Sequence, residues 1–207
     1  MTRRSTKAPA PLYAWTAAAV LAALAGCGKA QDTQAPKVDP AELQQRIEAL
    51  KARTRKHLVF VEGGSFMMGD FGEIHSEEKL PYSSNPDDNP LHKVTLDSYS
   101  ISAYKTTYED FDVFTDAMGK PRIAMTNRRD LQVRGVPGTP AGVSWQEGRD
   151  YCQWLGQQVG VPMDLPTEAQ WEYAARSRGQ IVIYPTDNGR MQWDGRPHPM
   201  TASMCQS

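Results

Sequence analysis

The sequence predicts an α+β domain that is rich in loops. Three observations favour this fold class: the 16 Gly and 15 Pro are spread along the chain, the strand-like apolar runs are only a few residues long, and the stretches with helical spacing are short and begin with capping residues. With 207 residues, the chain has room for one main domain and an appendage. A loop-rich mixed fold is favoured over a helical bundle, and a long coiled coil is excluded.

The charge balance argues against nucleic-acid binding. The formal net charge is -1, and no basic stripe is present that could release counterions from phosphates. Arg3, Arg4 and Lys7 lie in a first segment without acids, so the rest of the chain is more acidic than the total indicates. We therefore expect no nucleic acid among the partners.

The first 27 residues have the order of a secretory signal. A basic start is followed by an apolar run, Leu12–Leu24, and by two small residues before Cys27. A membrane-spanning anchor is the alternative, but the run has about 13 residues, whereas a bilayer core requires about 20. The pattern resembles a bacterial lipoprotein signal. We expect a signal peptide over 1–26 and acylation of Cys27, which would anchor the protein in the outer membrane at its periplasmic face.

Two segments connect this signal to the domain. Residues 27–38 are polar and predict a flexible tether. Asp39 then supplies a helix N-cap ahead of Pro40, and apolar residues at helical spacing follow. We expect a helical stalk over 39–56 that packs against the domain, with a partner-binding helix as the alternative. The domain itself is expected over 57–207.

Short strands are expected at the start of the domain. His57–Val61 and Ser65–Met68 flank a Gly-Gly pair and predict a hairpin. Lys93–Asp97 alternates between apolar and polar residues, and the apolar signal continues through Tyr99 and Ile101, which predicts a further strand.

Three short helices are predicted from capping residues. Thr107, Ser144 and Thr167 each stand three residues before an acid or an amide, the spacing of a capping box. The third helix is expected to bury Trp171. After it, Ile181–Tyr184 is expected to form a strand, and the sequence around residues 187–189 predicts a turn.

No metal site is signalled by sequence spacing. The four histidines never stand four residues apart on one helix face. Asp70–Asn89 is acidic, but its spacing fits no EF-hand, so a solvated loop is favoured over a calcium site.

A series of ordered motifs carries a family resemblance. Residues 63–69 read Gly-Gly-Ser-Phe-Met-Met-Gly, and residues 165–176 read Leu-Pro-Thr-Glu-Ala-Gln-Trp-Glu-Tyr-Ala-Ala-Arg. Together with motifs between them, they resemble the formylglycine-generating enzyme family, also called sulfatase-modifying factors, over roughly residues 57 to 185. The motif residues to which we assign structural roles are Gly63, Gly64, Phe66, Met68, Gly69, His92, Trp145, Cys152, Pro166, Thr167, Glu168, Trp171 and Glu172.

The resemblance implies a loop-rich sulfatase-modifying-factor domain, which is related to C-type lectins. Enzymes of this family oxidise a sulfatase cysteine to formylglycine with copper held by two cysteines, and relatives use iron. The family's catalytic cysteines lie downstream of the second motif, and the sequence ends at Ser207 without them. We expect a domain truncated at its C-terminus, with no catalytic, cofactor-binding or metal residue, and copper or iron only if a missing C-terminal part exists.

Cys152 and Cys205 are the cysteines that remain after Cys27. A disulfide between them would suit an oxidising periplasm, and a buried free thiol at Cys152 is the equal alternative.

The expected function is a non-catalytic binding module. Asp164 and the residues 176–180 and 186–189 resemble a lipoprotein branch of the family that is associated with type VI secretion. The resemblance implies an immunity or accessory role, with the lipid bilayer and a secreted effector such as a lipase as partners. The alternatives are a sulfatase-modifying oxidase, if the chain is a fragment of a longer protein, and a remnant without a stable core.

Overall fold

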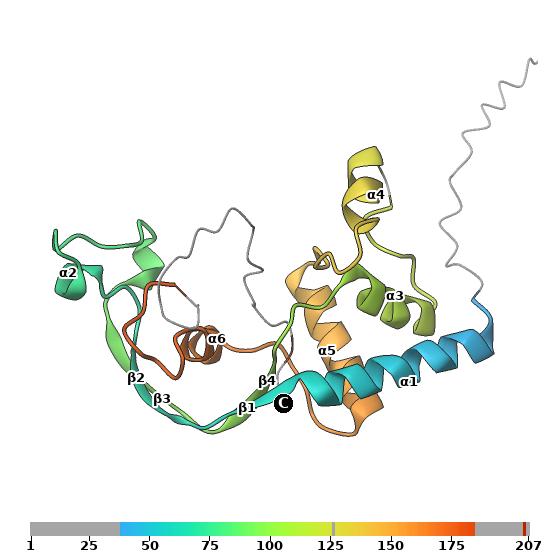
Figure 1. The fold of residues 1–207 in the computed structure, drawn as a ribbon, viewed down its shortest axis with the longest axis horizontal. Helices are drawn as coiled ribbons and strands as arrows, with labels where there is room; N and C mark the ends of the chain where they lie inside the picture. Colours follow the sequence, from blue (N-terminus) through green and yellow to red (C-terminus); the bar gives the residue numbers. More distant parts are fainter. Residues whose placement is uncertain (1–37, 126, 185–204, 206–207) are drawn as a thin grey trace, which may run out of the picture. The chain divides into compact units, whose positions relative to one another are not determined.

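The computed structural model describes residues 38–125, 127–184 and 205. Along these residues, a helix comes first, two pairs of short strands follow with two short helices between the pairs, and four helices then follow one another without a strand between them (Figure 1). The signal peptide expected over 1–26, the tether up to residue 37 and the turn at 187–189 lie outside the described residues. Among the helices that the structure describes, none is long and apolar enough to cross a membrane.

Four strands form one interrupted ribbon rather than the expected hairpin. β1 (Leu58–Val61) pairs antiparallel with β4 (Tyr99–Ser102), and β2 (Gly64–Met68) pairs antiparallel with β3 (His92–Leu96). The predicted pairing of His57–Val61 with Ser65–Met68 is therefore wrong. The register runs unchanged through both sheets, because no residue is gained or lost between the two sets of pairs.

Gly63 explains why the Gly-Gly pair does not reverse the chain. It lies where the two arms of the ribbon come closest, and a Cβ atom there would stand 2.7 Å from the backbone nitrogen of Ser98. The N–H of Gly63 donates to the Ser98 hydroxyl over 3.0 Å. The glycine is needed for close approach between the arms, so β1 continues into β2.

The loop between β2 and β3 contains two short helices. α2 (Gly72–His75) and the 3-10 helix η1 (Pro86–Asp88) lie within the acidic segment Asp70–Asn89, which the sequence predicted as a loop without elements. Asn85 accepts the N–H of Asp87 and so caps η1.

The larger core is helical. α1 (Pro40–His57), α3 (Tyr108–Ala117) and α5 (Trp145–Val159) pack around buried aromatic and aliphatic side chains. Asp39 caps α1, as the sequence predicted, and Leu50 is the α1 residue that is fully inside. The expected stalk is thus packed onto α3 and α5.

The predicted caps of the later helices are confirmed. Thr107 accepts the N–H of Asp110 at the start of α3, and Ser144 and Glu147 form a reciprocal capping box at the start of α5. Thr167 and Gln170 form the same box at the start of α6 (Glu168–Ala175). α4 (Arg128–Arg134) was not predicted, because none of its residues is buried and no apolar period marks it.

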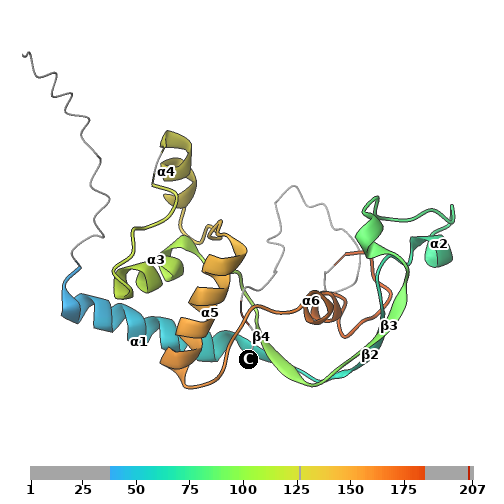
Figure 2. The same ribbon diagram turned by 180° about the vertical axis from the view of Figure 1, so that it is seen from behind.

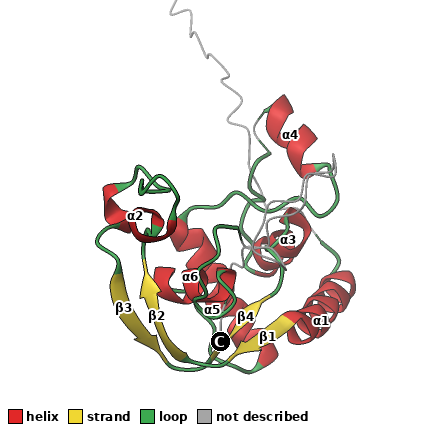
Figure 3. Ribbon diagram, turned by 60° about the vertical axis from the view of Figure 1, so that its left-hand side comes forward, coloured by secondary structure: helices red, strands yellow, loops and turns green. Residues whose placement is uncertain are grey.

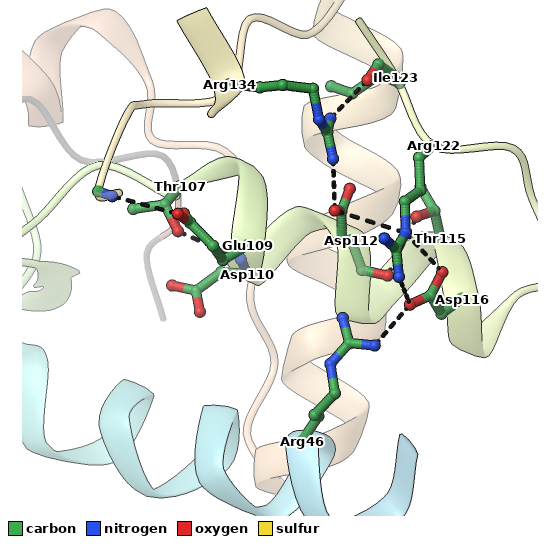
Figure 4. Close-up of polar contacts among 11 residues, drawn as sticks. Arg46, Thr107, Glu109, Asp110, Asp112, Thr115, Asp116, Arg122, Ile123 and Arg134 are labelled. Atoms are coloured by element: carbon green, nitrogen blue, oxygen red, sulfur yellow. Dashed lines mark hydrogen bonds and ion pairs between the residues drawn. The ribbon is translucent and has the colours of Figure 1, made fainter. Parts of the chain in front are cut away.

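Ion pairs fasten α1 and α4 to α3 (Figure 4). The fully buried carboxylate of Asp116 accepts hydrogen bonds of 2.7 Å from both Arg46 and Arg122. Burial raises the pKa of Asp116, but these two guanidinium groups outweigh burial and hold the pKa below its usual value. Asp112 accepts a hydrogen bond of 2.5 Å from Arg134, the last residue of α4.

The smaller core lies between the ribbon and α6. Tyr173 of α6 packs against Phe66 of β2, and their ring centroids are 5.1 Å apart. Tyr99 donates its hydroxyl to the carbonyl of Gln170 over 2.5 Å. Burial, together with the neighbouring Tyr173, raises the pKa of Tyr99 to about 12, so the hydroxyl stays protonated and remains a donor at neutral pH.

Two sequence predictions around α6 are wrong. Ile181–Tyr184 forms bends and no strand. Trp171 is 39% exposed, whereas Tyr173 is buried. Residues two apart on a helix point about 200° apart, so α6 cannot turn both rings inward, and the ribbon takes Tyr173.

A disulfide joins Cys152 of α5 to Cys205. Of the two alternatives left open by the sequence, the structure has the disulfide rather than a free thiol. Cys152 is completely buried among the aromatic residues of the helical core, and the carbonyl of Cys205 accepts the N–H of Ser102 in β4. The bridge therefore ties the end of the chain to both α5 and the ribbon.

We predict that Cys205→Ser lowers the free energy of unfolding by about 4 kcal/mol, the chain-entropy value for a closed loop of this length. Urea unfolding of the full chain, followed by intrinsic fluorescence, measures the change. Reduction with dithiothreitol should destabilise the parent chain equally and leave Cys205→Ser unchanged. A Cys27→Ser control should retain the parent midpoint. Equal midpoints for the oxidised parent and Cys205→Ser would contradict a stabilising bridge.

Candidate functional site

A cleft of about 270 Å³ lies between α6 and the loop that follows β2. α6 lies inside the curve of the β2–β3 ribbon and contacts both of its strands (Figures 1 and 2). Among the described residues, the aromatic and apolar walls of the cleft are Phe71, Tyr82, Trp171, Val182 and Ile183. Tyr82 and Trp171 are partly exposed and can therefore be reached from solvent.

Arg176 forms the polar floor of this cleft and is itself only 7% exposed. Its Nη1 donates to Glu172 over 2.5 Å and to the carbonyl of Met67 over 2.9 Å, and its Nε donates to the carbonyl of Gln180 over 2.8 Å. The guanidinium lies 4.6 Å from the ring centroid of Phe71. Among the described residues, no hydrogen-bond acceptor is found for its Nη2, which leaves the N–H groups of this nitrogen for a ligand acceptor.

Glu172 connects this floor to the ribbon. Its carboxylate accepts both the Arg176 hydrogen bond and the N–H of Gly69, over 3.1 Å. Gly69 has a φ of +109°, and a Cβ there would stand 2.6 Å from the carbonyl oxygen of Asp88. Only glycine fits this turn, and the turn brings the next residues to the cleft.

Asp70 holds the outer wall in place. Its two carboxylate oxygens accept the N–H groups of Gly72 and Ser83, each over 2.6 Å. Burial raises the pKa of Asp70, but the N–H donors of Ser83, Gly72 and Tyr82 outweigh burial and hold the pKa below its ordinary value of 3.8. The ionised carboxylate therefore pins the segment that carries Phe71 and Tyr82.

The structure brings only some of the residues singled out from the sequence to this cleft. Gly69, Trp171 and Glu172 line it. The ones that lie elsewhere form the ribbon, the helix starts and the disulfide: Gly63, Gly64, Phe66, Met68, His92, Trp145, Cys152, Pro166, Thr167 and Glu168. Cys27 lies outside the described residues.

Three residues of the cleft were missed by sequence reasoning. Asp70, Phe71 and Tyr82 lie in the acidic segment that was interpreted as a solvated loop. The aromatic residues within this otherwise polar stretch were the signal that could have indicated them. Arg176 was noted only as the end of a motif.

The described residues contain no group of three or more His, Cys, Asp or Glu side chains placed to hold a metal ion. A two-thiolate copper centre requires two free cysteines. In this structure the two described cysteines are joined to each other, so the residues present do not fit such a centre.

Comparison with known proteins gives one family match. Residues 44–204 match the family model described as the sulfatase-modifying factor enzyme 1-like domain. The formylglycine-generating enzyme of Streptomyces coelicolor is 28% identical, and the match covers 79% of this chain and 63% of that protein. The serine/threonine-protein kinase pkn1 of Chlamydia pneumoniae is 27% identical, over 62% of this chain and 20% of that protein.

Two further relatives bear on the comparison. The bovine protein named inactive C-alpha-formylglycine-generating enzyme 2 is 25% identical, over 64% of this chain and 52% of that protein. Among solved structures, PvdO from Pseudomonas aeruginosa has 27% identity and a TM-score of 0.44, over 65% of this chain and 52% of that chain. The chain thus spans about a fifth of the chlamydial kinase and less than two thirds of the Streptomyces enzyme.

We predict that the outer wall of the cleft loosens in acid. Because the pKa of Asp70 is lowered by folding, its stabilising contribution is present above the unfolded value and is lost as the pH falls below about 4 through the folded pKa. Hydrogen exchange of the peptide that contains residues 70–83, corrected for the intrinsic pH dependence, should rise in this range. Asp70→Asn should exchange faster already at neutral pH and show no further acid step.

Asp97→Asn is the matched control, because Asp97 is an exposed ribbon carboxylate without such contacts. The same protection in Asp70→Asn as in the parent would contradict the role given to this carboxylate.

Proposed function

We propose that this chain, which belongs to the sulfatase-modifying factor enzyme 1-like domain family, is a lipid-anchored binding module of a bacterial envelope. In this proposal the cleft holds an apolar or aromatic side chain of a protein partner. A secreted effector such as a lipase is the partner we favour, and the module would serve it as an immunity or accessory protein. The anchor is the acylated Cys27 and the location is the periplasmic face of the outer membrane.

The observation that carries the binding proposal is the lining of the cleft. Aromatic walls with a few polar groups are typical of sites that take an apolar anchor and fix its orientation by a polar contact. Nη2 of Arg176 can donate to a carbonyl or a carboxylate next to that anchor. Trp171 and Tyr82 supply large contact areas at the mouth, and both are residue types enriched at binding hot spots.

The second candidate function is a sulfatase-modifying oxidase, which the name of the Streptomyces relative favours. The pairing of Cys152 with Cys205 speaks against a copper site built from these two thiolates. The bovine relative named inactive is a case in which the family domain carries that name without the activity. Both points support the binding proposal over the oxidase.

We predict that a photo-crosslinking residue in the cleft captures one periplasmic protein. Benzoylphenylalanine is placed at Tyr82 in the full chain and, as a matched control, at Tyr104, an exposed tyrosine outside the cleft. Mass spectrometry after irradiation of intact cells should identify one adduct at Tyr82 that is absent at Tyr104.

Trp171→Ala should weaken partner binding by about 2 kcal/mol or more, the usual cost of an aromatic hot spot.

Trp145→Ala is the control for this substitution, because Trp145 is exposed at the start of α5 and lies outside the cleft. It should leave the adduct unchanged. Since Trp171 is partly exposed, its truncation should shift the melting temperature little. No adduct at Tyr82, or the same adducts at both tyrosines, would overturn the binding proposal.

We predict that the protein fractionates with membranes through Cys27. Cys27→Ala should remove metabolic palmitate label and release the protein from the outer-membrane fraction, because without acyl chains the stable anchor is lost. The Cys205→Ser variant serves as the cysteine control and should stay labelled. Membrane retention without label in the parent chain would indicate an uncleaved apolar helix instead.

A further inference from the structure

Among the described α-helices, α4 is the one without a buried residue. Leu131 and Val133 are each nearly half exposed. The flanking residues Met125 and Val136 are exposed as well. Single exposed apolar residues are ordinary, but here four of them lie on and beside a seven-residue helix.

Side-chain contacts hold α4 to the rest of the domain at its last residue. Arg134 donates to Asp112 of α3 over 2.5 Å and to the carbonyl of Ile123 over 2.6 Å, and its guanidinium lies 5.0 Å from the ring centroid of Tyr108 (Figure 4). The amino-terminal part of α4 projects from this attachment (Figure 3). The contacts of Arg134 therefore hold α4 in place while Leu131 and Val133 stay exposed.

The projecting end of α4 is basic. Arg128 and Arg129 are exposed, and neither forms an ion pair with a described residue. The segment from Met118 to Gly138 contains five basic residues and one acid, whereas Asp70–Asn89 contains six acids and one lysine. The domain is thus strongly asymmetric in charge, with its positive part around α4.

We propose that α4 and its flanks form a membrane-contact surface for an anionic phospholipid bilayer. Exposed Leu, Val and Met would enter the interface, and the two arginines would lie at the headgroup phosphates. This inference rests on the envelope location in the proposed function. Twelve residues separate Cys27 from Pro40 in the sequence, and such a segment spans at most about 40 Å, so an anchored domain stays within reach of the bilayer.

A bilayer fits these observations better than a protein partner. Leu131 and Val133 are two residues apart on the helix and point about 200° apart, so one groove of a protein partner would not cover both side chains. A fluid bilayer adapts to a projecting helix, and anionic lipid complements the exposed Arg128 and Arg129. With α4 against the membrane, the acidic segment and the cleft would be kept from the like-charged lipid surface.

The test uses the full, acylated chain carried in vesicles and an environment-sensitive label on α4. Val133→Cys is labelled with a nitrobenzoxadiazole fluorophore, and the chain is reconstituted into vesicles of phosphatidylcholine alone or of phosphatidylcholine with phosphatidylglycerol. The emission should rise and shift to the blue only in the vesicles that contain phosphatidylglycerol. Arg128→Gln with Arg129→Gln should lower the docking constant about fivefold per arginine, equivalent to about 1 kcal/mol each.

Two matched controls accompany these variants. Val161→Cys carries the same label on another exposed valine, outside α4 and its flanks, and should show no lipid-dependent change. Lys93→Gln with Lys105→Gln removes the same net charge from exposed sites elsewhere and should leave the Val133 signal intact. The parent chain without an introduced cysteine measures labelling at other positions.

The outcomes separate this inference from the proposed function. If the chain floats with neither kind of vesicle, the proposed lipid anchor at Cys27 is wrong, and the inference of docking to a nearby bilayer is wrong as well. If the chain floats with both and the Val133 label does not respond, the anchor stands and the membrane-contact surface is wrong. A label that responds equally in neutral vesicles, or to protein concentration without vesicles, also overturns the inference, the latter in favour of a second copy.

Discussion

The guanidinium of Arg176 joins three parts of the chain that are far apart in sequence. It binds the carbonyl of Met67 at the end of β2, the carboxylate of Glu172 one turn earlier on α6, and the carbonyl of Gln180 beyond the helix. Phe71, from the loop, lies over its face. These contacts offset the cost of taking the guanidinium out of water, so they fix where α6, the ribbon and the loop can lie. The cleft exists because the three parts meet at this group.

The local elements of the fold could be predicted because their signals lie within a few residues. Thr107, Ser144 and Thr167 satisfy N–H groups in the next turn, and such contacts require no knowledge of the rest of the molecule. The strand pairing could not be predicted this way. A glycine at position 63 is compatible both with a turn and with a close approach of two backbone segments. The choice between the two depends on the partner arm at Ser98, which the local sequence does not reveal. The helix α4 could not be predicted, because a helix without a buried face has no periodic spacing of apolar residues in its sequence.

The candidate site was predictable only in part, for the same reason. The hallmark stretch indicated Trp171 and Glu172, yet its helical spacing gave no information on which face would be inside, and Trp171 was wrongly expected in the core. Phe71 and Tyr82 reach the cleft through the Asp70 contacts to backbone N–H groups, which connect residues 13 apart. Such loop geometry depends on the turn at Gly69 and has no period that a sequence pattern could reveal.

The division of the cleft into floor and wall limits what family membership implies about ligands. The floor, Glu172 and Arg176, comes from the motif that identifies the family, and its contacts hold α6 against the ribbon. The wall, Phe71 and Tyr82, comes from the loop between β2 and β3, and loops vary in length and sequence more readily than the elements they connect. Two chains with the same hallmark helix can therefore share the fold and the buried arginine while presenting different walls. The ligand of this protein has to be inferred from its own loop, because a shared fold carries function only through the site built on it.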